Sequence, residues 1–535
     1  MRTPPGVSEV DFAKALQQFA DVVGSQWVVS SEDDVATYKD AYSPFWGEPE
    51  ERVVSAAVAP DSVEQIQKIL GVANHFSIPL YTVSTGRNLA YGGSAPAYSG
   101  SVVLDLKRMN RILEVSEQNA SALVEPGVSY FDLYRHIRAN KLKLWIDCPD
   151  PGWGSLVGNA LDHGAGYTSA PYRDHFAAHC GMEVVLANGE LVRTGMGAMP
   201  AAATWQQFQY GTGPIVDGLF SQSNFGVVTK MGFWLMPEPE AALSVVVTVP
   251  RHDDLAPLCD ALVGLVYADV VKSQTQVVSP VLHDEDATPE LSALLGRWDE
   301  GRVAALDDYA RRKGLPFWTC PFTFYGSEEI VRANWEFAKR RFSGIPGVQF
   351  KEEPWLRFPL SDEQVESLDT KSRSGVPSLK IFSSRRGLNQ PPLEGHIGFS
   401  PVVPMQGKAI LEAINVTLKA LHDLGVRPVG GMPLFYHLRT CMLIYSFPVG
   451  RDVAANRIVR EACRKLIDLC AARGWGEYRM HPAYVDQGVR LYSFNDNSLL
   501  RLQETLKDAL DPNGILSAGR YGIWPRHLRP PRAGG

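Results

Sequence analysis

Short strand-like runs alternate with helical patterns over the first 240 residues, and this alternation constrains the fold more than any other feature. The strand-like runs cover residues 53–58, 80–83, 101–106 and 122–124, and the helical patterns cover residues 61–74 and 129–138. Asp61 or Ser62 can cap the first helix, and Ser62 with Gln65 predicts a capping box. We therefore expect an α+β or α/β layout.

Two features predict how this part of the chain turns and ends. Asn188 and Gly189 lie between two apolar runs and favour a type I′ hairpin turn. A new pattern begins near residues 237–239, which read Pro-Glu-Pro, and a strand-like run and longer helices follow. At 535 residues the chain is too long for one core. The later elements are expected at residues 244–249, 255–266, 328–342, 407–424 and 454–473.

The composition excludes several classes of protein. A net charge of -7 disfavours binding to nucleic acid. Residues 1–12 carry no apolar run behind a basic segment, and no eighteen consecutive residues are apolar, so we expect a soluble cytoplasmic protein without membrane contact. The seven cysteines form no C-x-x-C pair, which argues against a disulfide framework or a structural zinc site and favours reduced thiols.

A glycine-rich segment directly after the strand at residues 80–83 is the strongest local motif. It reads S-T-G-R-N over residues 84–88 and Y-G-G-S over residues 91–94. Glycine lets the backbone N–H groups approach a ligand, and the polar side chains of Thr85 and Asn88 add donors, a combination that suits a diphosphate. A connecting loop without a ligand is the alternative interpretation.

Two further glycine-rich segments, residues 151–167 and 222–230, do not match known nucleotide motifs. Neither reads G-x-G-x-x-G at the start of a βαβ unit, and the chain contains no G-x-x-x-x-G-K-[ST]. Rossmann and P-loop nucleotide sites are therefore not expected.

Several blocks in a fixed order carry a resemblance to a known family. They are T-G-R-N…Y-G-G, C-P-D-P-G-W-G-S-L-V-G-N, R-T-G-M-G-A, S-Q-S-N-F-G-V-V-T-K-M-G, G-H-I-G-F-S-P, G-E-Y-R and D-P-N-G-I-L-S-A-G-R-Y-G-I-W. This collinear set covers nearly the whole chain and resembles the vanillyl-alcohol oxidase and p-cresol methylhydroxylase family, in its branch that oxidises 4-substituted phenols.

The resemblance implies an α+β fold with an FAD-binding domain made of residues 1–239 and 476–535, and an α+β cap domain of residues 240–475 over the flavin ring. It implies FAD bonded covalently through its 8α-methyl group to His396, and a homodimer or a larger homo-oligomer. The residues that it assigns to the cofactor are His396, Ser84, Thr85, Gly86, Arg87, Asn88, Gly92, Gly93, Ser94, Pro149, Gly154, Ser155, Gly158, Asn159, Gly226, Val228 and Arg520.

Taken alone, His396 is one of the chain's twelve histidines, and it lies in a strand-like apolar run. A structural histidine is therefore the alternative interpretation. A neutral imidazole nitrogen can attack the electrophilic tautomer of oxidised flavin, and the resulting bond raises the flavin potential. A flavin linked to tyrosine, as in p-cresol methylhydroxylase, is less expected here. The family places this histidine in a segment that resembles residues 395–401.

The resemblance also assigns a phenol site to Tyr91, Tyr478 and Arg479. Ionising a phenol of pKa near 10 at neutral pH costs ~4 kcal/mol, and two hydroxyl donors with a guanidinium favour the anion. Packing and a solvated ion pair are the alternative interpretations of these residues. Asp150 matches the family's acid/base carboxylate, and Asp147 is the alternative acid. Arg520, and also Arg479, would face the flavin edge where charge develops, and Tyr167 and Ser400 are further pocket candidates.

The implied reaction is hydride transfer from the benzylic carbon of a 4-hydroxybenzylic alcohol, 4-allylphenol or 4-alkylphenol, by way of a p-quinone methide, with O2 as the acceptor and hydrogen peroxide as a product. A cytochrome acceptor, a binding protein without activity and a metal-dependent hydrolase remain alternatives. The hydrolase would use His175, His179 and Cys180, although the helix that would place the two histidines on one face is scarcely one turn long.

Two segments depart from the family pattern, so the ring substituents that fit the pocket stay open. Residues 166–175 contain two extra residues, around Ser169 and Ala170, and an arginine at Arg173 where relatives usually have glycine. Residues 431–439 lack the paired histidines of relatives.

Overall fold

The computed structural model describes residues 2–168, 174–282, 288–369, 371–383, 395–426, 429–436 and 439–529. The insertion at Ser169 and Ala170 and the arginine Arg173 therefore lie outside the described residues. Within the described ranges no helix is both long and apolar enough to span a membrane.

The N-terminal segment forms a four-stranded sheet in the order β1-β2-β4-β3, in which β4 pairs in parallel with both β2 and β3. Ser62 caps the helix that follows β2 by accepting from the Gln65 N–H, while the Gln65 carboxamide accepts from the Asp61 N–H, so the predicted box closes on Asp61. The elements are α1 (Glu9–Val23), β1 (Val28–Val29), α2 (Glu32–Val35), β2 (Ala56–Val58), α3 (Val63–Phe76), β3 (Leu80–Val83) and β4 (Val102–Asp105).

A five-stranded antiparallel sheet follows, in the order β5-β6-β10-β8-β9. The predicted hairpin joins β8 and β9, but the predicted turn type was wrong. A type I′ turn requires a positive φ at both Asn188 and Gly189, and only Gly189 has one, at +86°. The elements are β5 (Ile112–Ser116), β6 (Ser121–Val124), α4 (Tyr130–Ala139), β7 (Leu144–Trp145), α5 (Leu156–Leu161), β8 (His179–Val185), β9 (Leu191–Arg193), β10 (Val227–Trp234) and β11 (Met236–Pro237), which pairs with β7.

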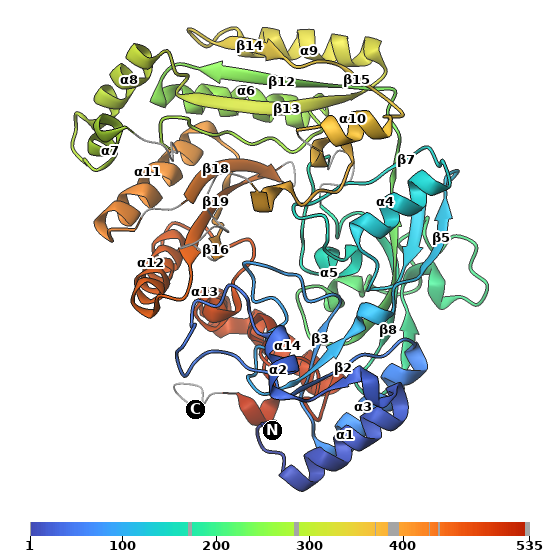
Figure 1. The fold of residues 1–535 in the computed structure, drawn as a ribbon. Helices are drawn as coiled ribbons and strands as arrows, with labels where there is room; N and C mark the ends of the chain where they lie inside the picture. The colour runs from blue at the N-terminus through green and yellow to red at the C-terminus, as the bar shows by residue number, and fades with distance from the viewer. Residues whose placement is uncertain are drawn as a thin grey trace.

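Two antiparallel sheets form the upper half of the molecule, and α6 packs against α11 (Figure 1). One sheet has the order β13-β12-β14, with β15 also on β12, and the other has the order β16-β19-β17, with β18 also on β19. The strands are β12 (Ala241–Val249), β13 (Trp318–Gly326), β14 (Gln349–Glu352), β15 (Leu356–Arg357), β16 (Gly395–Phe399), β17 (Val402–Pro404), β18 (Val429–Tyr436) and β19 (Thr440–Val449). The helices are α6 (Leu255–Tyr267), α7 (Pro289–Leu295), α8 (Arg302–Lys313), α9 (Glu328–Phe342), α10 (Asp362–Ser367), α11 (Gly407–Asp423) and α12 (Val453–Ala471).

The C-terminal tail returns to the N-terminal half through α13 (Val485–Leu491) and α14 (Phe494–Leu510) (Figure 1). Leu516 bridges to Leu80 of β3, and Ile515 and Leu516 are buried in the core of the first sheet. A separate large core is built almost wholly from residues between Leu243 and Tyr484. The cavity described next is lined by residues from all these parts of the chain.

Candidate active site

A cavity of about 1750 Å³ collects most of the residues that the sequence predicted to be functional. It exceeds the roughly 300–1,000 Å³ of common small-ligand sites, so it has room for a large cofactor beside a small substrate. Its lining includes Tyr91, Asp150, Tyr478, Arg479, His396, Ser84, Thr85, Gly86, Arg87, Asn88, Gly93, Pro149, Gly154, Ser155, Gly158, Asn159, Gly226, Val228, Arg520 and Tyr167. Gly92, Ser94 and Ser400 do not line it.

These three residues instead pack around the cavity wall. A Cβ on Gly92 would lie 2.7 Å from the Pro482 ring, so this glycine allows the loop to touch the C-terminal segment. The Ser94 hydroxyl donates to the Gly86 carbonyl at 3.2 Å and stabilises the loop. The Ser400 hydroxyl is fully buried without a hydrogen-bond partner in the described chain.

The loop after β3 presents a run of backbone donors. Within the described residues, the N–H groups of Thr85 through Leu89 donate no hydrogen bond to another part of the protein. Gly86 has a φ of +67°, and a Cβ at this position would lie 1.9 Å from the Ser94 hydroxyl. Backbone donors on residues that line a cavity, without protein acceptors, suit the oxygens of a diphosphate.

Helix α5 closes on this loop because Gly158 lacks a side chain, since a Cβ there would lie 2.2 Å from the Ser84 hydroxyl oxygen. In the third glycine-rich segment, a Cβ on Gly226 would lie 2.5 Å from the Val184 side chain of β8. Ser155 caps α5 by accepting from the Gly158 N–H. The glycines of both segments thus permit close packing around the cavity.

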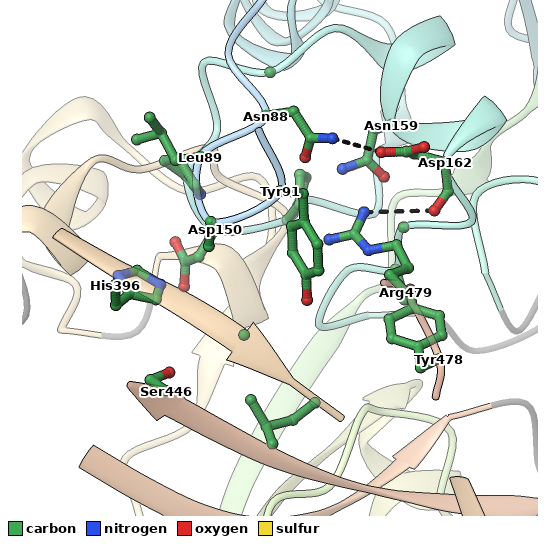
Figure 2. A pocket seen from close by; sticks show the side chains of 18 of the residues that line it. Asn88, Leu89, Tyr91, Asp150, Asn159, Asp162, His396, Ser446, Tyr478 and Arg479 are labelled. Carbon is green, nitrogen blue, oxygen red and sulfur yellow. Dashed lines mark hydrogen bonds between the residues drawn. The ribbon is translucent and has the colours of Figure 1, made fainter. Parts of the chain in front are cut away.

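His396 projects from β16 into the same cavity, as Figure 2 shows. Burial lowers the pKa of its imidazole to about 4, so the ring is neutral at physiological pH. Its ring centroid lies 5.4 Å from that of Tyr42, and its Nδ1 atom is buried without a partner among the described residues. A neutral imidazole with an unpaired ring nitrogen fits a covalent bond to a flavin.

The Arg479 guanidinium lies over the Tyr91 ring at 4.1 Å and near the Tyr478 ring at 5.4 Å (Figure 2). Burial lowers the Arg479 pKa, but the neighbouring Tyr478, Tyr91 and Asp162 groups raise it more, so the net shift is upward and the charge is permanent. Its Nε–H is buried without a partner in the described chain. Tyr478 donates its hydroxyl proton to the His163 carbonyl. This part of the cavity therefore favours an anion.

The two candidate carboxylates have different surroundings. Asp147 accepts from the N–H groups of Gly166 and Thr168 and from the Thr168 hydroxyl, so it closes a turn and does not line the cavity. Asp150 lines the cavity that also holds His396 (Figure 2). Of the two acids, Asp150 is the one placed to meet a ligand.

Asp162 belongs to the site, although no sequence motif singles it out. The residue is 4% exposed, and its carboxylate lies 3.3 Å from the Arg520 guanidinium and 2.5 Å from the Asn88 amide nitrogen. Its one sequence signal is an acid at the end of a short helix, and its partners are distant in the chain. Further cavity residues that were missed include Leu89, Gln276, Arg373, Ser446 and Tyr521.

His175 and His179 do not converge. The His175 ring contacts the Asn159 carboxamide and Asp147, whereas the His179 ring lies 3.2 Å from the Asp217 carboxylate. In the parts of the chain that the structure describes, no three His, Cys, Asp or Glu side chains are arranged to hold a metal ion.

Comparisons with known proteins agree with this site. Residues 54–195 match the FAD binding domain family. The chain is 33% identical to the flavoprotein subunit of 4-cresol dehydrogenase (hydroxylating) from Pseudomonas putida, over 97% of both proteins.

Two solved structures also match over nearly their full length. The 4-ethylphenol oxidase from Gulosibacter chungangensis, in its isoeugenol complex, is 34% identical with a TM-score of 0.85 over 98% of this chain and all of that one (100%). Substrate-bound p-cresol methylhydroxylase is 30% identical with a TM-score of 0.85 over 98% of this chain and 99% of that one. The predicted α+β fold is thereby confirmed, and the chain belongs to the vanillyl-alcohol oxidase and p-cresol methylhydroxylase family of FAD-dependent oxidoreductases.

Proposed function

We propose that the protein oxidises 4-alkylphenols, 4-allylphenols and 4-hydroxybenzylic alcohols at the carbon next to the ring. The observation that carries this proposal is the permanent charge of Arg479 beside Tyr91 and Tyr478, in the cavity that also contains His396. A phenol that enters this end of the cavity loses its proton more readily, because the guanidinium and the Tyr91 hydroxyl stabilise the anion. The Tyr478 hydroxyl adds to them when it turns from the His163 carbonyl.

Ionisation prepares the substrate for hydride loss. The phenolate oxygen pushes electron density through the ring toward the para carbon, so the benzylic C–H bond can break with its electron pair leaving as hydride. Residues 84–88 and 154–159 would hold FAD and His396 would bond to it, and the bound flavin would supply the hydride acceptor. Loss of a proton and a hydride converts the phenol into a p-quinone methide.

Asp150 directs the fate of the quinone methide. Water adds through its oxygen to the methide carbon while the Asp150 carboxylate accepts one of its protons, and the ring oxygen regains a proton as the phenol. A benzylic alcohol instead loses its hydroxyl proton and gives the aldehyde. Arg520 pairs with Asp162 in the same cavity and supplies a second positive charge there.

The proposal further assigns residues 1–239 and 476–535 to the cofactor domain and residues 240–475 to the cap, in line with the separate cores of these segments. It assigns O2 as the electron acceptor and a homodimer or larger homo-oligomer as the assembly. One relative is named a dehydrogenase flavoprotein subunit and another an oxidase, so a cytochrome acceptor is the second candidate.

The test is anaerobic mixing of the yellow protein with a panel of para-substituted phenols, followed by admission of air. Bleaching of the flavin absorbance by 4-ethylphenol, followed by stoichiometric hydrogen peroxide, supports the proposal. A flavin that no phenol reduces would overturn it, while reduction without peroxide would transfer the acceptor assignment to a cytochrome.

A further inference from the structure

Asp162 occupies a position that local helix energetics disfavour. It caps the C-terminus of α5, where the helix dipole places partial negative charge, and its side chain is 5% exposed. A carboxylate at this end is destabilised unless cations lie nearby. Its presence therefore calls for an explanation outside the helix.

The partners of Asp162 come from three remote segments. Asn88, in the loop after β3, donates to one carboxylate oxygen at 2.5 Å. Arg520 donates to the other at 3.3 Å, and the Tyr521 hydroxyl also donates to it. Arg479 approaches the Asp162 backbone carbonyl at 3.5 Å, as drawn in Figure 2. Asp162 thus connects the cofactor loop, the C-terminal tail and the anion end of the cavity.

The charges in this cluster are nearly balanced. Arg479 and Arg520 each carry one positive charge and Asp162 carries one negative charge, so the three groups sum to +1. Although burial raises the Asp162 pKa, the two arginines and the hydrogen bonds lower it more, so the carboxylate stays ionised. One excess positive charge matches a single anion. Before hydride transfer this anion is the phenolate, and afterwards the negative charge has left the substrate with the hydride.

We propose that Asp162 is a positioning residue that holds Arg520 and limits the charge available to the anion near Arg479 and Arg520. This inference rests on the proposed function, since it concerns the ionisation of a bound phenol. Without the carboxylate, the cluster of Arg479, Arg520 and residue 162 would carry a charge of +2, bind phenolate more tightly and lower the pKa of the bound phenol further.

Asp162→Asn tests the charge with little change of shape. The remaining oxygen can accept from Arg520 and Tyr521, and the Asn88 amide can rotate to accept from the new NH2 group. Asp217→Asn is the matched control, because Asp217 is also a buried carboxylate beside a basic group but does not line the cavity.

The two readouts are the pKa of bound 4-hydroxybenzaldehyde and the flavin midpoint potential. This probe has no sp³ benzylic C–H bond to donate, and its anion absorbs at longer wavelength than the neutral phenol. In Asp162→Asn the bound pKa should fall by about one unit, about tenfold in the ratio of anion to phenol, and the potential should rise. The control should change neither. An unchanged or raised pKa in Asp162→Asn would overturn the inference.

A second variant keeps the test decisive if Asp162→Asn does not fold. Arg520→Gln leaves the cluster neutral, so the bound pKa should rise by about one unit, and a fall or no change would overturn the inference. Wild-type protein that binds the probe only as the neutral phenol would refute the proposed function as well. A probe bound as the anion with equal pKa in wild type and Asp162→Asn would refute the role of Asp162 alone.

Discussion

Replacing Arg479 with glutamine removes a permanent charge from the anion end of the cavity while keeping a polar side chain of similar length. A unit charge about 4 Å from a phenolate oxygen contributes about 4 kcal/mol at an effective dielectric constant near 20, which corresponds to about three pKa units. The glutamine amide returns part of this through a hydrogen bond, so we expect the pKa of the bound phenol to rise by about two to three units.

The guanidinium brings the bound pKa from about 10 to about 7, so at pH 7 its loss lowers the ionised fraction, and with it the rate of flavin reduction, by about 50- to 500-fold. The rate is measured by anaerobic stopped-flow absorbance with 4-ethylphenol between pH 7 and 9.5. The rate of flavin reduction in Arg479→Gln should rise with pH. Without the guanidinium the bound phenol ionises only when the solution is more alkaline.

Two control variants isolate the cause. Arg464→Gln removes an exposed arginine on α12 outside the cavity and should leave the rate unchanged. Arg479→Lys keeps the charge but loses the planar fork and should fall between wild type and Arg479→Gln. A wild-type rate in Arg479→Gln at pH 7, or a loss that does not recover at high pH, would refute the reasoning.

Three other perturbations test separate parts of the account. Because the pKa of His396 is about 4, incorporation of FAD into apoprotein should proceed equally fast at pH 5.5 and 7.5, whereas an ordinary histidine of pKa ~6.5 would be only about a tenth neutral at the lower pH. The His396→Ala variant should release all its flavin on acid precipitation, and flavin retained in the pellet would contradict the linkage. Lys507 is 0% exposed and lies 2.7 Å from the Asp511 carboxylate, so Lys507→Met should cost about 3–5 kcal/mol in urea unfolding, and a loss below about 1 kcal/mol would show that the pair contributes little. Gly158→Ala places a methyl group 2.2 Å from the Ser84 hydroxyl oxygen and should weaken FAD binding in equilibrium titrations. Adding Ser84→Ala to this variant should restore binding, and a double variant that binds FAD as weakly as Gly158→Ala would exclude this contact as the cause.

Much of the fold was accessible from local patterns. The strand expected at residues 80–83 forms as β3, and the helix expected at residues 129–138 forms as α4, because each has the apolar period of its element and a clear cap or turn beside it. The turn at Asn188 was predicted as type I′ because its dipeptide allows it. The observed backbone needs a positive φ only at Gly189, which a longer turn with a glycine bulge also satisfies.

The site was less accessible, because its contacts join distant segments. Gly92 and Ser94 share the glycine-rich motif with the cavity residues, yet they serve packing and loop shape, and no local pattern separates these roles. Asp162 was missed for the same reason, since its partners Arg520 and Tyr521 follow it by more than 350 residues. The choice between Asp147 and Asp150 likewise required the three-dimensional turn that occupies Asp147.

The central claim is that the cavity ionises a ring hydroxyl so that the opposite side chain can give up a hydride. The most direct measurement compares 4-ethylphenol with its methyl ether, which has the same benzylic C–H bond but no ionisable proton, in anaerobic mixing with the wild-type protein. The phenol should bleach the flavin absorbance and the ether should leave it unchanged even at saturating concentration. Reduction of the flavin by the ether at a comparable rate would contradict the account.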